Sequence, residues 1–122
     1  MLLDSLYTIK SLEHKTGLIV AGLELQEDHP IFQGHFPGKP VLPGACMVQM
    51  VKEIFQMEMN ESLQLQKANA IKFLQMIQPH ENKILQLQIQ FKEVDESNIQ
   101  VNASINSHEK LCFKLTGIYK KE

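Results

Sequence analysis

The sequence contains no arginine and no tryptophan, and only two of its 122 residues are cysteines. All twelve basic residues are therefore lysines, which are set against 14 acidic residues for a net charge of −2. Because arginine supplies the bidentate contacts to guanine and phosphate, and no lysine cluster replaces it, nucleic-acid binding is not expected. The cysteines, Cys46 and Cys112, stand in apolar stretches without metal-ligand spacing, which argues against a disulfide framework and against a zinc site.

Long apolar runs are also absent. No stretch approaches the roughly 18 apolar residues of a membrane span, and residues 1–6 lack the basic region of a signal peptide. We therefore expect a cytoplasmic protein without membrane insertion. With 43% hydrophobic residues the chain has enough apolar material for a core of its own, and we expect a single domain over residues 1–122.

Hydrophobic periodicity predicts one helix among several strands. Apolar residues alternate over residues 17–25, which indicates a largely buried strand. Residues 26–43 are rich in glycine and proline and predict a long structured loop, a feature that is usually functional. Residues 44–59 contain no proline and have an apolar stripe at helical spacing, which predicts an amphipathic helix of about four turns that begins after Pro43.

The second half of the chain predicts an antiparallel meander. After a polar link at residues 60–66, we expect strands at residues 68–77, 85–91, 99–105 and 111–115, with turns between them. Apolar residues alternate with glutamine, asparagine and serine in the middle strands, so one face of the sheet is buried. A strand, then a helix, then consecutive antiparallel strands predict an α+β fold in which a curved sheet wraps the helix.

The loop before the helix carries the most specific motif of the chain. Residues 34–44 read GHFPGKPVLPG, and they resemble, nearly residue for residue, the signature of the beta-hydroxyacyl-(acyl carrier protein) dehydratases. The resemblance continues through Lys72 and Phe73 to Pro79. The chain resembles the shorter members of the family, which lack the N-terminal helix of the housekeeping enzymes. It implies the hot-dog fold, in which a curved antiparallel sheet is wrapped around one central helix.

This resemblance also implies an activity and partners. The expected reaction is dehydration of 3-hydroxyacyl thioesters, carried on acyl carrier protein, to trans-2-enoyl thioesters. The expected assembly is a homodimer or a higher oligomer of dimers, with each site built across the interface. No metal or cofactor is implied, because the phosphopantetheine arm arrives with the substrate. Lys39, at the mouth of the loop, could contact an acidic carrier protein.

Two residues of the signature match the family's chemistry. His35 matches the catalytic histidine, and an imidazole that titrates near neutral pH suits proton transfer in both directions. Gly44 matches the residue whose N–H binds the thioester carbonyl, at the positive end of a helix dipole. Phe36 and Pro43 are expected beside the substrate. The purely structural alternatives are that His35 only holds the loop in place and that Gly44 is needed only for the turn before the helix.

The family's acidic residue is where this sequence departs from the pattern. Five residues after Gly44 the family has Glu or Asp, but this chain has Gln49, whose amide binds a hydroxyl but cannot act as a carboxylic acid. One turn later stands Glu53, where relatives commonly have Gln, and its side chain is expected to lean back toward Gln49. We hypothesise that Glu53, alone or through a water held by Gln49, is the acid. Alternatively, Glu53 belongs with Lys52 and Gln56 on a solvated stripe.

Other residues are weaker candidates. Cys46, near the start of the helix, could be an activated thiolate or a small buried residue. His29 and His35 could be imagined as metal ligands, but no neighbouring Cys or Asp completes a set. Two other functions stay open: a thioesterase of the same fold, in which Glu53 would activate water, and a non-catalytic acyl-binding subunit of a heteromeric dehydratase.

Overall fold

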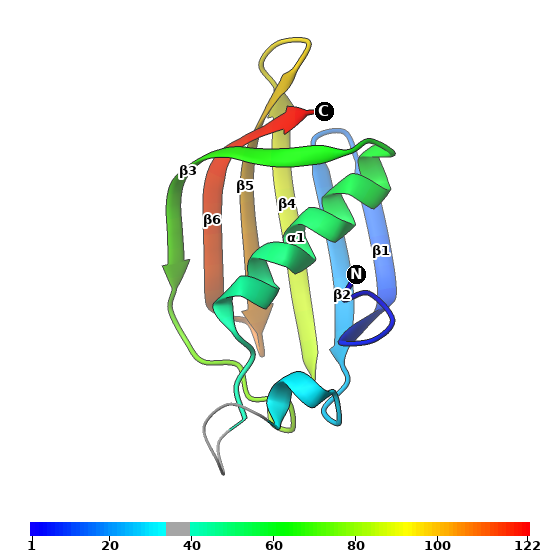
Figure 1. Ribbon diagram of the computed structural model, residues 1–122, viewed down its shortest axis with the longest axis vertical. Coiled ribbons are helices and arrows are strands. Elements are labelled where there is room, and N and C mark those ends of the chain that lie inside the picture. Colours follow the sequence, from blue (N-terminus) through cyan, green and yellow to red (C-terminus); the bar gives the residue numbers. More distant parts are fainter. Residues whose placement is uncertain (34–39) are drawn as a thin grey trace.

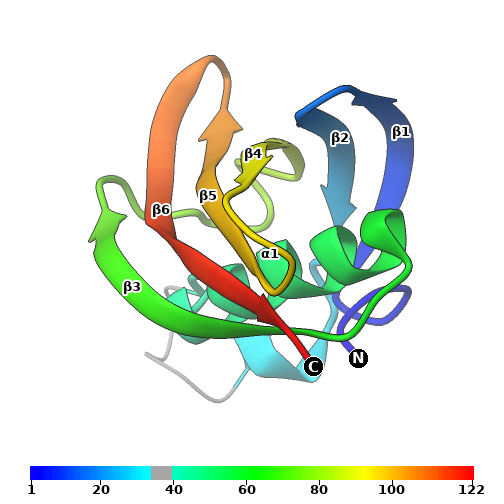
Figure 2. The ribbon, with the colours of Figure 1, turned by 90° about the horizontal axis from the view of Figure 1, so that it is seen from above.

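The computed structural model describes residues 1–33 and 40–122. Within these ranges the elements follow in the order β1 (Tyr7–Lys15), β2 (Leu18–Leu25), η1 (Pro30–Phe32), α1 (Gly44–Met59), β3 (Leu63–Phe73), β4 (Ile84–Glu93), β5 (Asn98–Ser107) and β6 (Lys110–Lys121). The strands form one antiparallel sheet in the order β1-β2-β4-β5-β6-β3. The sheet curves around α1 (Figures 1 and 2), which confirms the hot-dog arrangement.

Helix α1 begins and ends where the sequence predicts. Pro43 takes the N-cap position in an extended conformation, and its carbonyl accepts the N–H of Cys46 at 3.1 Å. The helix ends at Asn60, whose left-handed backbone (φ 53°) is one that asparagine tolerates. In the described part of the chain, no helix is long and apolar enough to cross a membrane.

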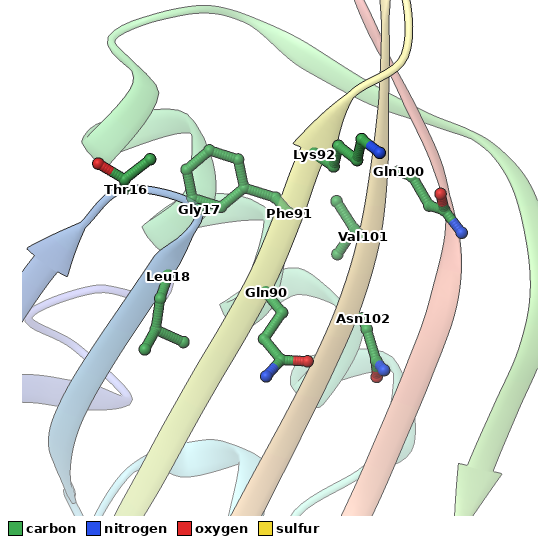
Figure 3. Close-up of a pocket in the computed structure, with 9 residues that line it drawn as sticks. All are labelled: Thr16, Gly17, Leu18, Gln90, Phe91, Lys92, Gln100, Val101 and Asn102. Atoms are coloured by element: carbon green, nitrogen blue, oxygen red, sulfur yellow. The ribbon is translucent and has the colours of Figure 1, made fainter.

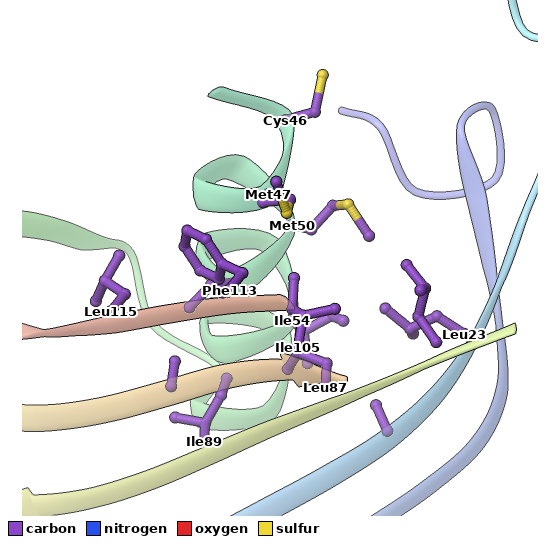
Figure 4. Close-up of a cluster of buried hydrophobic side chains, with 14 of the residues drawn as sticks. Leu23, Cys46, Met47, Met50, Ile54, Leu87, Ile89, Ile105, Phe113 and Leu115 are labelled. Carbon is purple, nitrogen blue, oxygen red and sulfur yellow. The ribbon is translucent and has the colours of Figure 1, made fainter. Parts of the chain in front are cut away.

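The apolar stripe of α1 packs on the concave face of the sheet (Figure 4). Met50, Val51, Ile54 and Phe55 are fully buried against alternate residues of the strands, which include Leu87, Ile89, Ile105, Phe113 and Leu115. Full burial of one such side chain contributes about 1.5–3 kcal/mol. This contact fixes which side of α1 faces the sheet and leaves Gln49 on another side of the helix, partly exposed.

Three strands differ from the sequence predictions. β1 was not predicted, because most of its side chains are exposed and give no alternating pattern. β3 runs from Leu63 to Phe73 rather than over residues 68–77, and bulges near Leu65 and Ala68 bend it so that its first part crosses the end of α1 (Figure 1). β6 continues to Lys121, past Gly117, where a Cβ would collide with the carbonyl oxygen of Lys67.

Strand β3 is one edge of the sheet, and it and the segment that follows it carry exposed apolar side chains. It pairs with β6 on one side, and β1 is the opposite edge. Ile71, Phe73, Leu74 and Met76 are exposed to 37%, 56%, 50% and 70%. An unpaired edge strand with apolar neighbours is a template for association.

Candidate functional site

Part of the predicted site lies on residues that the structure does not describe. His35, Phe36 and Lys39 fall within residues 34–39, so their expected roles stay predictions. The rest of the signature leads into α1 through Leu42, which is buried and whose N–H donates to the carbonyl of Ile77 at 2.8 Å. This bond fixes the start of α1 beside the segment that follows β3.

An apolar groove of about 310 Å³ lies at this junction. Its lining consists of Val41, Leu42, Gly44 and Met47 from the helix side and Phe73, Leu74, Gln75 and Met76 from the other. The first N–H groups of a helix have no partner within the helix, and no residue in the described part of the chain accepts the N–H of Gly44. An apolar groove that ends at the N-terminus of a helix, with the positive end of its dipole, suits an acyl chain with a polarised carbonyl.

The missing side chain of Gly44 allows the close approach of Phe73. A Cβ at position 44 would lie 2.6 Å from Cε1 and 2.7 Å from Cζ of the Phe73 ring. The backbone of Gly44 is helical, and among the described glycines only Gly17 has a positive φ. The structure thus adds a packing role for Gly44 beside Phe73, and its expected contact with a thioester carbonyl stays a prediction. The Phe73 ring, which also packs on Phe113 at 5.5 Å between centroids, forms one wall of the groove.

Glu53 is a buried carboxylate with four hydrogen-bond donors. One oxygen, Oε2, accepts the N–H of Leu2 at 2.8 Å and the Nε2 of Gln49 at 2.9 Å. The other, Oε1, accepts the N–H of Leu3 at 2.9 Å and the hydroxyl of Tyr7 at 3.1 Å. An ionised carboxylate has about four lone-pair sites, so these donors saturate it. Its side chain is only 2% exposed.

These contacts determine the protonation of Glu53. Burial is the strongest influence and raises its pKa, but the bonds from Leu2, Gln49, Leu3 and Tyr7 together outweigh burial, so the pKa lies below its ordinary value. The pKa of Tyr7 is raised, first by burial and then by the charge of Glu53. At neutral pH, Glu53 is therefore ionised and Tyr7 is neutral.

The saturated carboxylate tests both hypotheses for Glu53, the catalytic acid and the residue on a solvated stripe. The predicted contact with Gln49 is confirmed, and the placement of Glu53 on a solvated stripe is wrong, because residues 1–7 cover it. The geometry argues against Glu53 as the acid, since it holds no proton and has no lone pair left for a substrate hydroxyl. Sequence reasoning missed Leu2, Leu3 and Tyr7, because bonds across 46 to 51 residues leave no local pattern.

A cavity of about 290 Å³ lies next to this carboxylate. It is lined by Met1, Leu2, Ala45, Cys46, Gln49 and Glu53. Burial raises the pKa of the Cys46 thiol, so the activated-thiolate interpretation is not supported and the small buried residue is. Gln49 contributes a polar group to this cavity. Its amide nitrogen donates to Glu53, and its carbonyl oxygen has no hydrogen-bond partner among the described residues.

The remaining candidates do not form a site. His29 accepts the N–H of Ile31 on Nδ1 at 3.0 Å and caps η1. Among the described residues, no group of three or more His, Cys, Asp or Glu side chains could hold a metal. A hollow of about 410 Å³ at the β1–β2 turn is lined mainly by Gln90, Gln100, Asn102 and their neighbours (Figure 3), and it contains no residue of the predicted site.

The sequence comparisons with known proteins indicate dehydratases. The ApeI-like family model, described as ApeI dehydratase, matches residues 10–115. A 3-hydroxyacyl-[acyl-carrier-protein] dehydratase, FabZ, of Hydrogenobaculum sp. (strain Y04AAS1) is 38% identical over 58 residues, which are 47% of this chain and 39% of that protein. The match thus spans less than half of that relative's length.

Solved structures support the fold. The dehydratase heterocomplex ApeI:P from Xenorhabdus doucetiae superposes with a TM-score of 0.71 at 19% identity, covering 90% of this chain and 95% of that one. A hypothetical thioesterase with coenzyme A from Streptococcus pneumoniae superposes with a TM-score of 0.69 at 11% identity, covering 95% and 85%. At these identities the similarity establishes the architecture.

Proposed function

The chain belongs to the ApeI-like dehydratase family, and on this basis we propose that it dehydrates 3-hydroxyacyl thioesters of acyl carrier protein to trans-2-enoyl thioesters. The observation that carries the proposal is the apolar groove that ends at Gly44. In this proposal the thioester carbonyl accepts the N–H of Gly44, and the acyl chain lies against Met47 and Phe73. Charge that develops on the carbonyl oxygen as C2 loses its proton is then stabilised by the helix N-terminus.

The proton chemistry is assigned to His35 from the sequence signature. His35 takes the proton from C2 and, as the imidazolium, returns it to the 3-hydroxyl. The C2–C3 double bond forms as the C3–O bond breaks, and the hydroxyl leaves as water. Pro43 and Phe36 are proposed to lie beside the substrate. The reaction needs no metal or redox cofactor, because the phosphopantetheine arm is part of the substrate.

The proposed assembly is a pair of sheets joined through strand β3. Its support is the unpaired edge and the exposed side chains of Ile71 and Phe73. In this proposal, as the family resemblance implies, each site lies across the interface of a homodimer. Acyl carrier protein is the proposed partner in solution.

A second candidate is the acyl-binding subunit of a heteromeric dehydratase. It is favoured by one observation, the saturation of Glu53 beside a neutral Gln49, which leaves this face of α1 without a proton donor. The similar ApeI:P structure is a heterocomplex. In this case a second protein supplies the acid.

One assay separates these functions. The purified chain is incubated with 3-hydroxyacyl-(acyl carrier protein) of short and long chain length, and the carrier is examined by mass spectrometry. Loss of water that His35→Ala abolishes is the expected result. Release of free thiol would indicate a thioesterase instead. Binding of the acylated carrier without turnover would indicate the heteromer subunit.

A further inference from the structure

We propose that Asn82 is a positioning residue that fixes the spacing between the two sides of the apolar groove at Gly44, and that it thereby determines how wide an acyl chain the groove accepts. The inference rests on the proposed function and deepens it, because it names a residue that selects among acyl substrates. Asn82 does not line the groove. It acts through the segment at residues 74–83.

The segment at residues 74–83 supplies one side of the groove and contains no helix or strand. Leu74 and Met76 are 50% and 70% exposed, so burial of their side chains does little to hold this side in place. The N–H groups of Leu74 and Gln75 donate to the carbonyl of Cys112 on β6, at 2.8 and 3.3 Å. The rest of the segment must therefore be held by contacts further along the chain.

A hydrogen bond from Leu42 to Ile77 joins the two sides of the groove. Ile77 is fully buried, and its carbonyl accepts the N–H of Leu42 at 2.8 Å. In the described part of the chain, this is the one hydrogen bond between the two sides. The position of the Ile77 carbonyl therefore sets how far Met76 lies from Leu42.

Asn82 fixes the residue that follows Ile77. Its side-chain oxygen Oδ1 accepts the N–H of Gln78 at 3.0 Å, and its Nδ2 donates to Oγ of Ser107 at 2.8 Å. Because a main-chain N–H can only donate, Gln78 determines which end of the amide faces it. Ser107 is the last residue of β5 and is 3% exposed. One side chain thus ties the backbone beside Ile77 to the sheet.

Loss of the Asn82 amide would free the segment without unfolding its turn. The main-chain N–H of Asn82 would still donate to the carbonyl of Gln78 at 2.7 Å, so the path of the chain would be kept. The Ile77 carbonyl could then shift, and the groove could widen. A groove with fixed sides excludes a chain that is too wide, whereas a groove with a yielding side accepts it.

The experiment compares two acyl chains of equal carbon number and different width. A pantetheine amide with a straight hexanoyl chain and one with the branched isohexanoyl chain are titrated calorimetrically; neither can react, because an amide replaces the thioester. We expect the unmodified protein to bind the straight chain about 10-fold more tightly, the value of one misplaced methyl group. Asn82→Leu should reduce this preference to below about 3-fold.

Two further variants serve as rescue and control. Asn82→Asp should keep the preference, because one carboxylate oxygen can accept the N–H of Gln78 and the other the hydroxyl of Ser107. Asn98→Leu makes the Asn-to-Leu change in the β4–β5 turn, where the Asn98 amide donates to Asp95 at 3.0 Å. It removes a comparable bond away from the groove and should also keep the preference.

Amide hydrogen exchange tests the positioning role without a ligand. The Leu42 N–H should exchange about 10-fold faster in Asn82→Leu, because two hydrogen bonds that hold its acceptor are lost. The Ile89 N–H, in the middle of the sheet, reports global unfolding and corrects for a general loss of stability. Asn98→Leu should leave the corrected exchange of Leu42 unchanged.

The outcomes separate this inference from the proposed function. Unchanged exchange of Leu42 in Asn82→Leu, or a chain preference that survives this substitution, overturns the inference while the proposed dehydration stands. Failure of both amides to bind the unmodified protein contradicts the acyl groove, and the selectivity role with it. If Asn82→Leu does not fold, Ser107→Ala, which removes only the bond to β5, takes its place and should weaken the preference.

Discussion

The side-chain nitrogen of Gln49 donates a 2.9 Å hydrogen bond to Oε2 of Glu53, one turn further along α1. The same carboxylate accepts two main-chain N–H groups and the phenol of Tyr7. The residue at the family's acid position is thus tied to a saturated, ionised group. Neither member of this pair is therefore a proton donor for the proposed dehydration.

Glu53→Gln should lower the free energy of unfolding in a pH-dependent way. The new NH₂ group replaces an oxygen that accepted hydrogen bonds, so it faces other donors and these bonds are lost. A buried group left without a hydrogen bond costs about 1–3 kcal/mol. Because the pKa of Glu53 is lowered by folding, its stabilisation is present above the pKa of the unfolded chain, about 4.3, and is lost as pH falls through the folded value. Chemical denaturation should show the difference in full at neutral pH and shrinking toward acid. A difference that stays constant into the acid range would contradict the ionised state.

Tyr7→Phe and Tyr119→Phe form a matched pair. The Tyr7 hydroxyl donates to Glu53, so its removal should cost about 1 kcal/mol. The Tyr119 hydroxyl is buried and has no hydrogen-bond partner among the described residues, so its removal should be neutral or slightly stabilising. Equal losses in the two variants would show that the Glu53 contact contributes nothing specific.

The alkaline titration of the tyrosines is a separate prediction. Tyr7 and Tyr119 are the only tyrosines of the chain. Burial raises the pKa of Tyr119 to about 12, and burial with the charge of Glu53 raises that of Tyr7. The folded protein should therefore show little tyrosinate absorbance at a pH where free tyrosine, with a pKa of about 10, is half ionised. Full ionisation there without unfolding would contradict the buried positions of both rings.

Gly44→Ala should disturb the groove more than the fold. The new Cβ collides with the Phe73 ring, which is 56% exposed and can swing aside, so the stability cost should stay below about 1 kcal/mol. Affinity for acyl-pantetheine ligands should fall, because the displaced ring occupies the groove. In a Phe73→Ala background, Gly44→Ala should have no further effect on stability. Additive effects of the two substitutions would exclude a contact between them.

Ile71→Lys should weaken self-association through the edge of β3. A lysine at this exposed apolar position introduces a charge that edge pairing would have to desolvate. Leu12→Lys, at an exposed apolar position on the opposite edge strand β1, is the control and should leave the assembly unchanged. Sedimentation velocity of both variants measures this. Loss of the oligomer in Leu12→Lys alone would place the interface at β1.

Local patterns accounted for much of the architecture and for part of the site. Hydrophobic periodicity is a property of neighbouring residues, so it gave the bounds of α1 and the presence of the strands around Leu87 and Val101. It failed for β1, where Tyr7 is the one buried residue, because an exposed edge strand has no buried face to impose alternation. The i, i+4 contact of Gln49 and Glu53 was also predictable, since helix geometry alone creates it.

The sequence by itself determined the α+β order of elements, the helix that begins at Gly44 and the signature that points to acyl-thioester dehydration. The tertiary structure decided what surrounds the key groups. Only folding brings Leu2 and Tyr7 to Glu53, and main-chain N–H groups are donors that no side-chain pattern reveals. Likewise, only the tertiary structure places the ring of Phe73, 29 residues later in the sequence, in the space that glycine leaves at position 44.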